Sequence, residues 1–355
     1  MQALLSGFIL LWVLLTTPTW AAPLDYPRVQ ADTRLAFPRD HGAHPAFRNE
    51  WWYATGWLET AAGPLGFQVT FFRTRPNLDQ TNPSRFSPRQ FLIAHAALSD
   101  AQRLRHDQRI ARAGFGLAEA SVVDTAVHID EWSLSRGADG VYRARIPARE
   151  FTLELDLRPT QPLLLQGGTG FSRKGPGPDQ ASHYYSQPHL AVSGSVVRDG
   201  RRLAVRGRAW LDHEWSSEIL APGAAGWDWT GINLEDGGAL TAFRIRDRRG
   251  NTLWAGGSLR TADGRLQVLG PKDIEFSPLR RWRSPQSRTE YPVTMRVRAG
   301  NLRLQLHPLL DAQEVDGRAS SGVRYWEGAV TAEKDGRAVG RGYLELTGYE
   351  RPLDF

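Results

Sequence analysis

The segment VTMRVRAGNLRLQLH, residues 293–307, carries the clearest structural signal in the chain. Around the central turn Ala299-Gly300-Asn301, apolar residues occupy every second position, namely Val293, Met295, Val297, Leu302, Leu304 and Leu306. A period of two is typical of a β-strand with one buried face. Two such strands joined by a short turn predict a β-hairpin.

The same alternation recurs in FTLELDL, residues 151–157, and Asp-Gly turn signals such as Asp199-Gly200 and Asp335-Gly336 separate further strand-like runs. The 35 glycines, 22 prolines and 13 tryptophans also favour short strands with tight connections. We therefore expect an all-β fold, an antiparallel meander closed into barrels or stacked as sandwiches. Only residues 99–113 suggest a helix, and residues 76–88 and 167–178 suggest loops at a barrel mouth or lid.

Composition excludes several classes of protein. The 355 residues suffice for two domains or one large β unit. The absence of cysteine excludes disulfides, thiolate metal sites and cysteine nucleophiles. The net charge of +6 comes almost entirely from arginine scattered among acids, so we expect no nucleic-acid partner.

The N-terminal residues resemble an export signal. Residues 3–15 are apolar apart from Ser6 and Gly7, and small residues follow near Ala21 and Ala22, after either of which cleavage is expected. The apolar run is shorter than the roughly 20 residues of a spanning helix. We therefore predict a signal peptide over residues 1–21 and an exported, periplasmic protein.

Standard catalytic signatures are missing from the sequence. It contains no G-x-S-x-G elbow, no Walker A motif and no H-E-x-x-H motif. His41 and His44 are three residues apart, and His183 and His189 are six apart, and neither spacing defines a metal site without further ligands. We expect no metal and no cofactor.

Four clusters combine aromatic residues with acids or histidines: residues 50–57 (EWWYATGW), 182–189 (SHYYSQPH), 209–218 (AWLDHEWSSE) and 226–237 (GWDWTGINLEDG). Strand alternation predicts which side chains share a face. Glu50 and Trp52 should face away from Trp51 and Tyr53. His213 and Trp215 should oppose Asp212 and Glu214, and Trp227 and Trp229 should oppose Asp228.

Carboxyl groups inside aromatic strands are costly unless they are paired or stay protonated. One interpretation is structural, since buried tryptophans often pair with a neighbouring polar group. The functional interpretation is a deep apolar cavity with a few polar groups that binds an elongated hydrophobic molecule. A carboxyl group held neutral there could protonate a carbon–carbon double bond, with Glu50, Asp212 or Asp228 as candidates.

The four clusters, together with HPAFRN, FSRKGP and LAVSG around them, resemble the AttH and carotenoid 1,2-hydratase family over residues 44–349. The resemblance implies two consecutive lipocalin-like antiparallel β-barrel domains, which we assign to residues 22–218 and 219–355, with a break near residues 222–226. It also implies activities that include addition of water to an isoprenoid double bond, and members associated with ABC transporters.

The resemblance to the hydratases also implies a catalytic His-x-Trp element, which matches His213 and Trp215. We expect Asp212, Asp228 and Glu50 as further catalytic candidates and expect the ligand to contact Trp52, His183, Tyr185, Trp227 and Trp229. Two other functions stay open. The protein could be a noncatalytic carrier of a lipophilic molecule serving a transporter, or its barrels could be rigid spacers with an external interaction surface.

Overall fold

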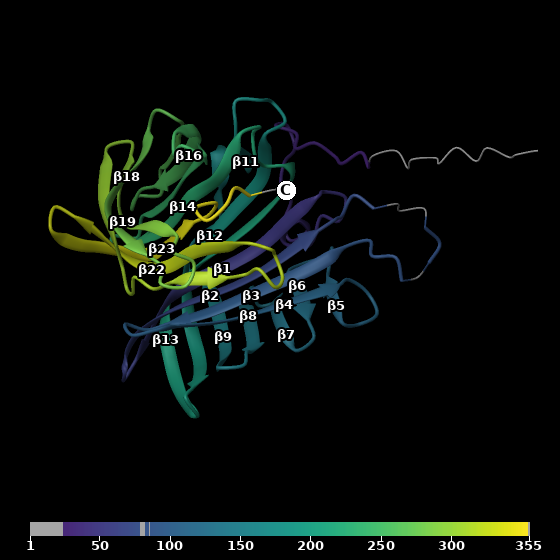
Figure 1. The fold of residues 1–355 in the computed structure, drawn as a ribbon, viewed down its shortest axis with the longest axis horizontal. Helices are drawn as coiled ribbons and strands as arrows, with labels where there is room; N and C mark the ends of the chain where they lie inside the picture. Colours follow the sequence, from purple (N-terminus) through teal and green to yellow (C-terminus); the bar gives the residue numbers. More distant parts are fainter. Residues whose placement is uncertain (1–23, 79–81, 85, 354–355) are drawn as a thin grey trace, which may run out of the picture.

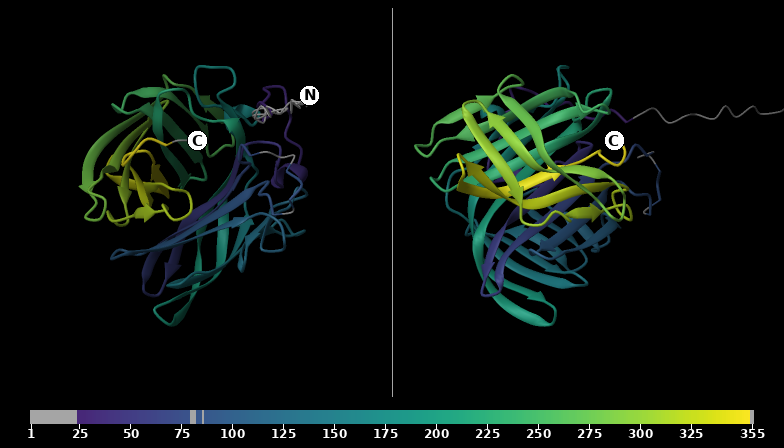
Figure 2. Two further views of the ribbon diagram at one scale, coloured as in Figure 1. Left: turned by 45° about the vertical axis from the view of Figure 1, so that its right-hand side comes forward. Right: turned by 60° about the vertical axis from the view of Figure 1, so that its left-hand side comes forward.

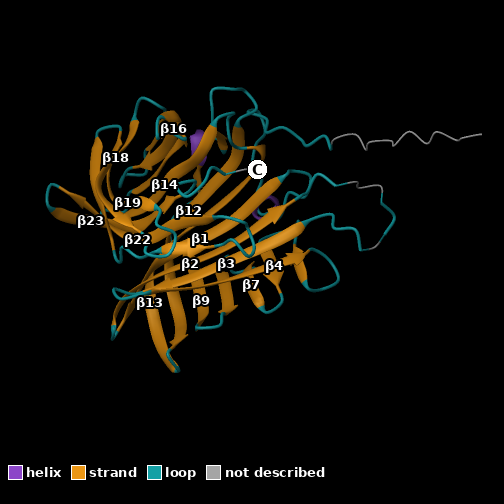
Figure 3. Ribbon diagram, in the orientation of Figure 1, coloured by secondary structure: helices purple, strands orange, loops and turns teal. Residues whose placement is uncertain are grey.

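The computed structural model describes residues 24–78, 82–84 and 86–353, and apart from two short 3-10 turns its regular elements are all β-strands (Figures 1 and 3). The all-β prediction is confirmed. The strands form two antiparallel sheets of 13 and 10 strands. The 3-10 turns are η1 (Arg39–His41) and η2 (Gln166–Gly168).

The first sheet runs in the order β4-β3-β2-β1-β13-β12-β9-β8-β7-β6-β5, with β10 and β11 also paired to β12. It curls until β4 lies against β6, which makes a nearly closed barrel around an apolar core. Its strands are β1 (Asn49–Thr60), β2 (Gly63–Thr74), β3 (Phe91–Ser99), β4 (Leu104–Arg112), β5 (Ala118–Ala120), β6 (Ala126–Ile129), β7 (Trp132–Arg136), β8 (Tyr142–Pro147), β9 (Phe151–Pro159), β10 (Leu164–Leu165), β11 (Phe171–Arg173), β12 (Ala181–Arg198) and β13 (Arg201–Glu218).

The second sheet runs in the order β17-β16-β15-β14-β23-β22-β20-β19-β18, with β21 also paired to β22, and it encloses a second apolar core. Its strands are β14 (Ala224–Leu234), β15 (Ala239–Asp247), β16 (Thr252–Arg260), β17 (Leu266–Leu269), β18 (Ile274–Arg283), β19 (Glu290–Ala299), β20 (Leu302–Pro308), β21 (Glu314–Asp316), β22 (Arg324–Lys334) and β23 (Arg337–Leu346). The predicted hairpin over residues 293–307 is confirmed as β19 and β20.

The helix expected over residues 99–113 is wrong, because Leu104–Arg112 is strand β4. Its inward positions are polar, so they hide the period of two that would have identified a strand. Arg105 is buried in ion pairs with Asp100 and Asp199. Asp107 is buried beside Arg149.

Residues 167–178 are only partly the loop that was expected. Strand β11 lies within this segment and pairs with β12 from Phe171↔His183 to Arg173↔Ala181. The signal-peptide prediction concerns residues 1–21, which lie outside the part of the chain that the structure describes. No helix within the described residues is long and apolar enough to cross a membrane.

The two sheets pack against each other through their outer faces, as Figure 2 shows for the green and yellow strands of the second sheet. Trp57 of β1 donates its indole N–H to the carbonyl of Gly342 in β23 at 3.1 Å. The approach is close at Gly66, where a Cβ atom would lie 2.6 Å from the Ala329 side chain. This contact buries an apolar set that includes Tyr53, Trp57, Trp210, Trp229, Phe243 and Tyr343.

Candidate functional site

Strand β13 divides the polar residues of its motif between two sites. His213 and Trp215 point into the first barrel, where Trp215 belongs to the core. Asp212 points the other way, where it contacts Trp210 and Tyr184 at the contact between the sheets. The alternation predicted from the sequence is therefore confirmed, and it separates the predicted site residues into two groups.

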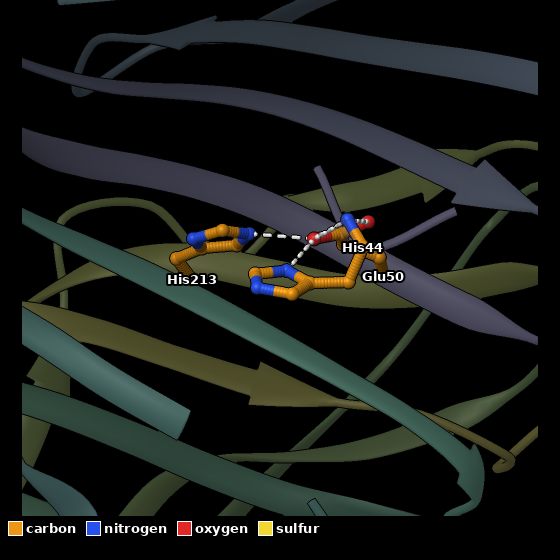
Figure 4. A group of neighbouring side chains, drawn as sticks. All are labelled: His44, Glu50 and His213. Atoms are coloured by element: carbon orange, nitrogen blue, oxygen red, sulfur yellow. Dashed lines mark hydrogen bonds and ion pairs between the residues drawn. The ribbon is translucent and has the colours of Figure 1, made fainter. Parts of the chain in front are cut away.

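Glu50 is the centre of the group inside the first barrel (Figure 4). One carboxylate oxygen, Oε1, lies 2.8 Å from His44 Nδ1 and 2.9 Å from His213 Nε2. The other, Oε2, accepts hydrogen bonds from Arg73 Nε at 2.7 Å and from the His44 backbone N–H at 2.9 Å. Arg73 is the direct cross-strand partner of Glu50 on β2. His44, Glu50 and His213 are also the residues here that could hold a metal ion.

These contacts decide the ionisation of the barrel group. Burial alone would raise the pKa of Glu50, but hydrogen bonds from His213 and His44 and the charge of Arg73 hold it well below its ordinary value. Burial lowers the pKa of His213. Burial also opposes protonation of His44, but its bonds to Asp40 and Glu50 outweigh this and raise its pKa. Glu50 is thus a carboxylate, and the neutral-acid role considered for it from the sequence is corrected.

The barrel group continues through Tyr185. Its hydroxyl lies 2.7 Å from His41 Nδ1 and 3.2 Å from His213 Nδ1. Trp52 stacks on the His213 ring with centroids 4.7 Å apart, and Trp215 stacks on the His44 ring at 3.7 Å. His183 packs against Trp215 at 5.5 Å. The rings of this group are therefore held by packing as well as by hydrogen bonds.

Asp212 is the centre of the second group, at the contact between the sheets. Its side chain is buried and accepts hydrogen bonds from Trp210 Nε1 at 2.6 Å, Ser186 Oγ at 2.5 Å and Tyr184 Oη at 2.7 Å. Tyr184 in turn accepts a hydrogen bond from Trp229 of the second sheet at 3.1 Å. Asp212 is thereby linked to aromatic residues of both domains.

The carboxyl group of Asp212 has a pKa near neutral pH. Burial raises its pKa to about 7, against the opposing effect of its hydrogen bonds from Ser186, Tyr184 and Trp210, and the charge of Glu214 adds to the rise. At neutral pH such a group is protonated about half of the time, which suits a general acid. Among the three carboxyl groups considered from the sequence, Asp212 has the environment that the proposed chemistry needs.

Lys174 is a buried cation beside Tyr184, the hydrogen-bond partner of Asp212. Its ammonium group forms a 2.8 Å ion pair with Glu214, which also accepts a hydrogen bond from Ser182. The same ammonium group lies over the rings of Tyr184 and Phe243, at 4.7 and 4.2 Å from their centroids. A buried cation on two aromatic faces shows that these rings can stabilise positive charge.

Two carboxyl groups of the second sheet face the same region. Glu327 and Glu345 are direct cross-strand partners on β22 and β23. Burial raises the pKa of Glu345 to about 7 against the hydrogen bond from Trp227. Burial and the charge of Glu345 raise the pKa of Glu327 well above its ordinary value. Glu327 and the Tyr53 hydroxyl are buried and interact with each other, which opposes the rise in the pKa of Glu327.

Asp228 belongs to neither group. It faces the interior of the second barrel, opposite to Trp227 and Trp229, as the alternation predicted. Its oxygens accept hydrogen bonds from Arg244 at 2.6 Å, Arg246 at 3.0 Å and Tyr349 at 2.9 Å. Its carboxyl group is therefore engaged by two arginines and a tyrosine, and its role as a catalytic candidate stays a prediction.

The predicted site residues thus fall in three places. The first barrel holds Glu50, Trp52, His183, Tyr185, His213 and Trp215, the contact between the sheets holds Asp212, Trp227 and Trp229, and the interior of the second barrel holds Asp228. The sequence interpretation missed Arg73, Lys174, Glu327 and Glu345. Glu327 stands in a Tyr-Trp-Glu motif and Lys174 is one of only three lysines, so there was a reason in the sequence to consider both as site residues. Nothing in the sequence around Arg73 indicated a role in the site.

The chain forms two consecutive antiparallel β-barrels. One polar cluster lies inside the first barrel and another lies between the two barrels. This arrangement defines a lipocalin-like double-barrel protein. The family model described as AttH-like matches residues 28–349. The chain belongs to the AttH-like family, and the family resemblance stated from the motifs is confirmed. A search of the curated proteins finds no match.

Solved structures agree with this assignment. The chain is 53% identical to a protein from Nitrosomonas europaea assigned to AttH, with a TM-score of 0.86, covering 91% of this chain and 99% of that one. The fold is also shared with kievitone hydratase from Nectria haematococca, at 15% identity, a TM-score of 0.66, and 91% and 96% coverage. CghA with Sch210972 matches at 12% identity, a TM-score of 0.53, and 91% and 98% coverage. The last two similarities concern the fold.

Proposed function

We propose that this protein is a hydratase-like enzyme that binds a hydrophobic isoprenoid or polyene at the contact between its two domains and adds water to a carbon–carbon double bond. The observation that carries the proposal is Asp212, a buried carboxyl group whose pKa is raised to about 7 among aromatic rings. Membership of the AttH-like family, together with a fold shared with kievitone hydratase, supports a hydratase-like role.

The first step is transfer of the Asp212 proton to one carbon of the double bond, which leaves a carbocation on the other carbon and a carboxylate on Asp212. The rings of Trp210, Trp229 and Tyr184 lie around this carboxyl group. A well-placed ring face stabilises a cation by about 0.5–2 kcal/mol.

In the second step a water molecule attacks the cation and loses a proton. Glu345 is the proposed base, because it is only partly buried and because the charge of Asp212 adds to the rise in its pKa. Two carboxyl groups that disfavour each other's charge tend to hold one proton between them. Solvent exchange then returns the proton from Glu345 to Asp212, and the net reaction is alkene plus water to alcohol.

Buried polar groups beside Asp212 support a ligand at this place. Tyr53 is the cross-strand partner of Asp212, and its hydroxyl interacts with Glu327. A hydroxyl group on the product could join this pair. The same arrangement would suit a carrier that binds a lipophilic molecule without changing it, so the test must separate the two.

The test is incubation of the purified protein with isoprenoid alkenes in water enriched in ¹⁸O. An enzyme gives an alcohol that carries the ¹⁸O label, and Asp212→Asn abolishes its formation. Asp107→Asn, which changes a buried carboxylate elsewhere in the first barrel, is the matched control. Bound but unmodified alkene at a ratio near one to one would instead establish a carrier.

Export is part of the proposal and rests on the N-terminal sequence pattern alone. N-terminal sequencing of the protein from the periplasmic fraction would give Ala22 or Pro23 as the first residue if the segment is a cleaved signal peptide. An intact N-terminus in the cytoplasmic fraction would contradict it. The transporter partner expected from the resemblance has no support in the comparisons and is not part of this proposal.

A further inference from the structure

Three ligand atoms converge inside the first barrel, at some remove from the proposed acid. His44 Nδ1, Glu50 Oε1 and His213 Nε2 all lie within 4.8 Å of one another, and Figure 4 shows both rings directed at the same carboxylate oxygen. We infer that these residues form a binding site for one divalent transition-metal ion, with zinc as the best match to the donor set. The inference stands independently of the function proposed for Asp212.

In each histidine, the ring nitrogen that faces away from Glu50 contacts a polar side chain. Histidines that ligate a metal are usually held in this way. His44 Nε2 lies 3.4 Å from the carboxylate of Asp40, and His213 Nδ1 lies 3.2 Å from the Tyr185 hydroxyl. An outer hydrogen bond to a carboxylate or hydroxyl fixes the ring and selects the nitrogen that carries a lone pair. The inner nitrogens lie at hydrogen-bond distance from Glu50 Oε1, 2.8 and 2.9 Å, and an ion that binds here would replace the protons of these two bonds.

Packing also presets the site. The His44 ring is nearly parallel to Trp215, with an interplanar angle of 5°, and the His213 ring lies at 20° to Trp52. The side chains of His213 and Glu50 are fully buried, whereas that of His44 is 18% exposed. An ion would therefore enter past His44, and the ligands need little reorganisation to receive it.

Arg73 determines how Glu50 would bind. Arg73 Nε donates a hydrogen bond to Glu50 Oε2 at 2.7 Å, so the carboxylate offers only Oε1 to the ion. The charged groups that face the three ligands are Arg73, Asp40 and Glu50 itself, while Arg39, paired with Asp40, is largely in solvent.

The distances from Glu50 to the two rings require only a small adjustment. Zinc bonds of about 2.0–2.2 Å in a tetrahedral site place ligand atoms about 3.3 Å apart. The two ring nitrogens now lie 2.8 and 2.9 Å from Glu50 Oε1, so the ligands would open by about 0.5 Å. Two histidines and one carboxylate leave the fourth position for water, the donor set of open zinc sites.

The test uses untagged protein, because a histidine tag would itself bind zinc. The protein is dialysed against EDTA and then titrated with Zn²⁺ by isothermal calorimetry, and Co²⁺ is added to a second sample for visible absorption. We expect one Zn²⁺ per chain and a Co²⁺ spectrum displaced by zinc. Asp40→Asn should weaken binding about 10–100-fold, as loss of an outer partner does, and His44→Gln should weaken it more.

His183→Gln is the matched control, since His183 packs against Trp215 in the same barrel but contributes no ligand atom. It should bind zinc as the unchanged protein does. Circular dichroism establishes that each variant is folded, and His44 is the ligand least buried and therefore least needed for folding. Absence of stoichiometric zinc binding by the folded protein, or equal weakening by His183→Gln and His44→Gln, would overturn the inference.

Discussion

Glu327 of β22 and Glu345 of β23 are direct cross-strand partners, and both carboxyl groups point from the second domain toward the first. Like charges at such a position repel, because the side chains of opposed residues lie about 5 Å apart. Burial raises the pKa of both groups and so keeps them protonated at moderately acidic pH. The contact between the two domains is therefore sensitive to pH.

The first prediction is that the stability contributed by the Glu345 carboxyl group is lost as the pH rises from about 4.5 to 7. A raised pKa in the folded state means that the folded protein retains a proton that the unfolded chain has lost in this window. For Glu345 the pKa rises from 4.5 to about 7, and at about 1.4 kcal/mol per unit the loss amounts to about 3 kcal/mol. Urea unfolding at pH 5 and at pH 8 measures it.

Glu345→Gln serves as the diagnostic variant for that prediction. The amide cannot ionise, so the variant should lose less stability between pH 5 and pH 8 than the unchanged protein does. Glu59→Gln, at an exposed position, should leave the difference as it is. An identical pH dependence of the unchanged protein and Glu345→Gln would show that this carboxyl group does not titrate in the window.

The second prediction concerns Glu50. Glu50→Gln leaves the buried guanidinium of Arg73 without its counter-charge, and breaking a buried pair in this way costs about 3–5 kcal/mol. Thermal unfolding at pH 7 should show the loss, while Glu59→Gln, an exposed control, should change stability by less than about 0.5 kcal/mol. Equal effects of the two substitutions would contradict the buried network.

The third prediction concerns Tyr184, which donates a hydrogen bond to Asp212 at 2.7 Å. That bond lowers the pKa of Asp212, so Tyr184→Phe should raise it. If Asp212 is the general acid, activity falls as the pH passes above its pKa, and this limb should move to higher pH in Tyr184→Phe. Tyr185→Phe, which alters the barrel group instead, should leave the limb in place.

The sequence predicted the strands where one face is apolar and the other is polar. The hairpin of β19 and β20 and strand β9 follow this pattern, and the faces of His213 and Asp212 were assigned correctly from it. The pattern failed for β4, whose buried face holds Arg105 and Asp107 in ion pairs with residues distant in sequence.

The candidate sites were less predictable, because their chemistry depends on which surfaces meet. Asp212 owes part of its environment to the second domain, because Trp229 of that domain bonds to Tyr184, the partner of Asp212. The pKa of Glu50 is lowered by hydrogen bonds from His213 and His44 and by the charge of Arg73, which lies beside it through a β1–β2 register that the local sequence does not specify. The motifs therefore identified most of the residues, but not their charge states or their division between two sites.

The central claim is that Asp212 protonates a carbon–carbon double bond. It is tested most directly by mass spectrometry of the product formed in ¹⁸O-enriched water by the unchanged protein, by Asp212→Asn and by Asp107→Asn. The account predicts an ¹⁸O-labelled alcohol from the unchanged protein and from Asp107→Asn, and none from folded Asp212→Asn. Labelled alcohol from Asp212→Asn at the unchanged rate, or only unmodified alkene from all three proteins, would contradict it.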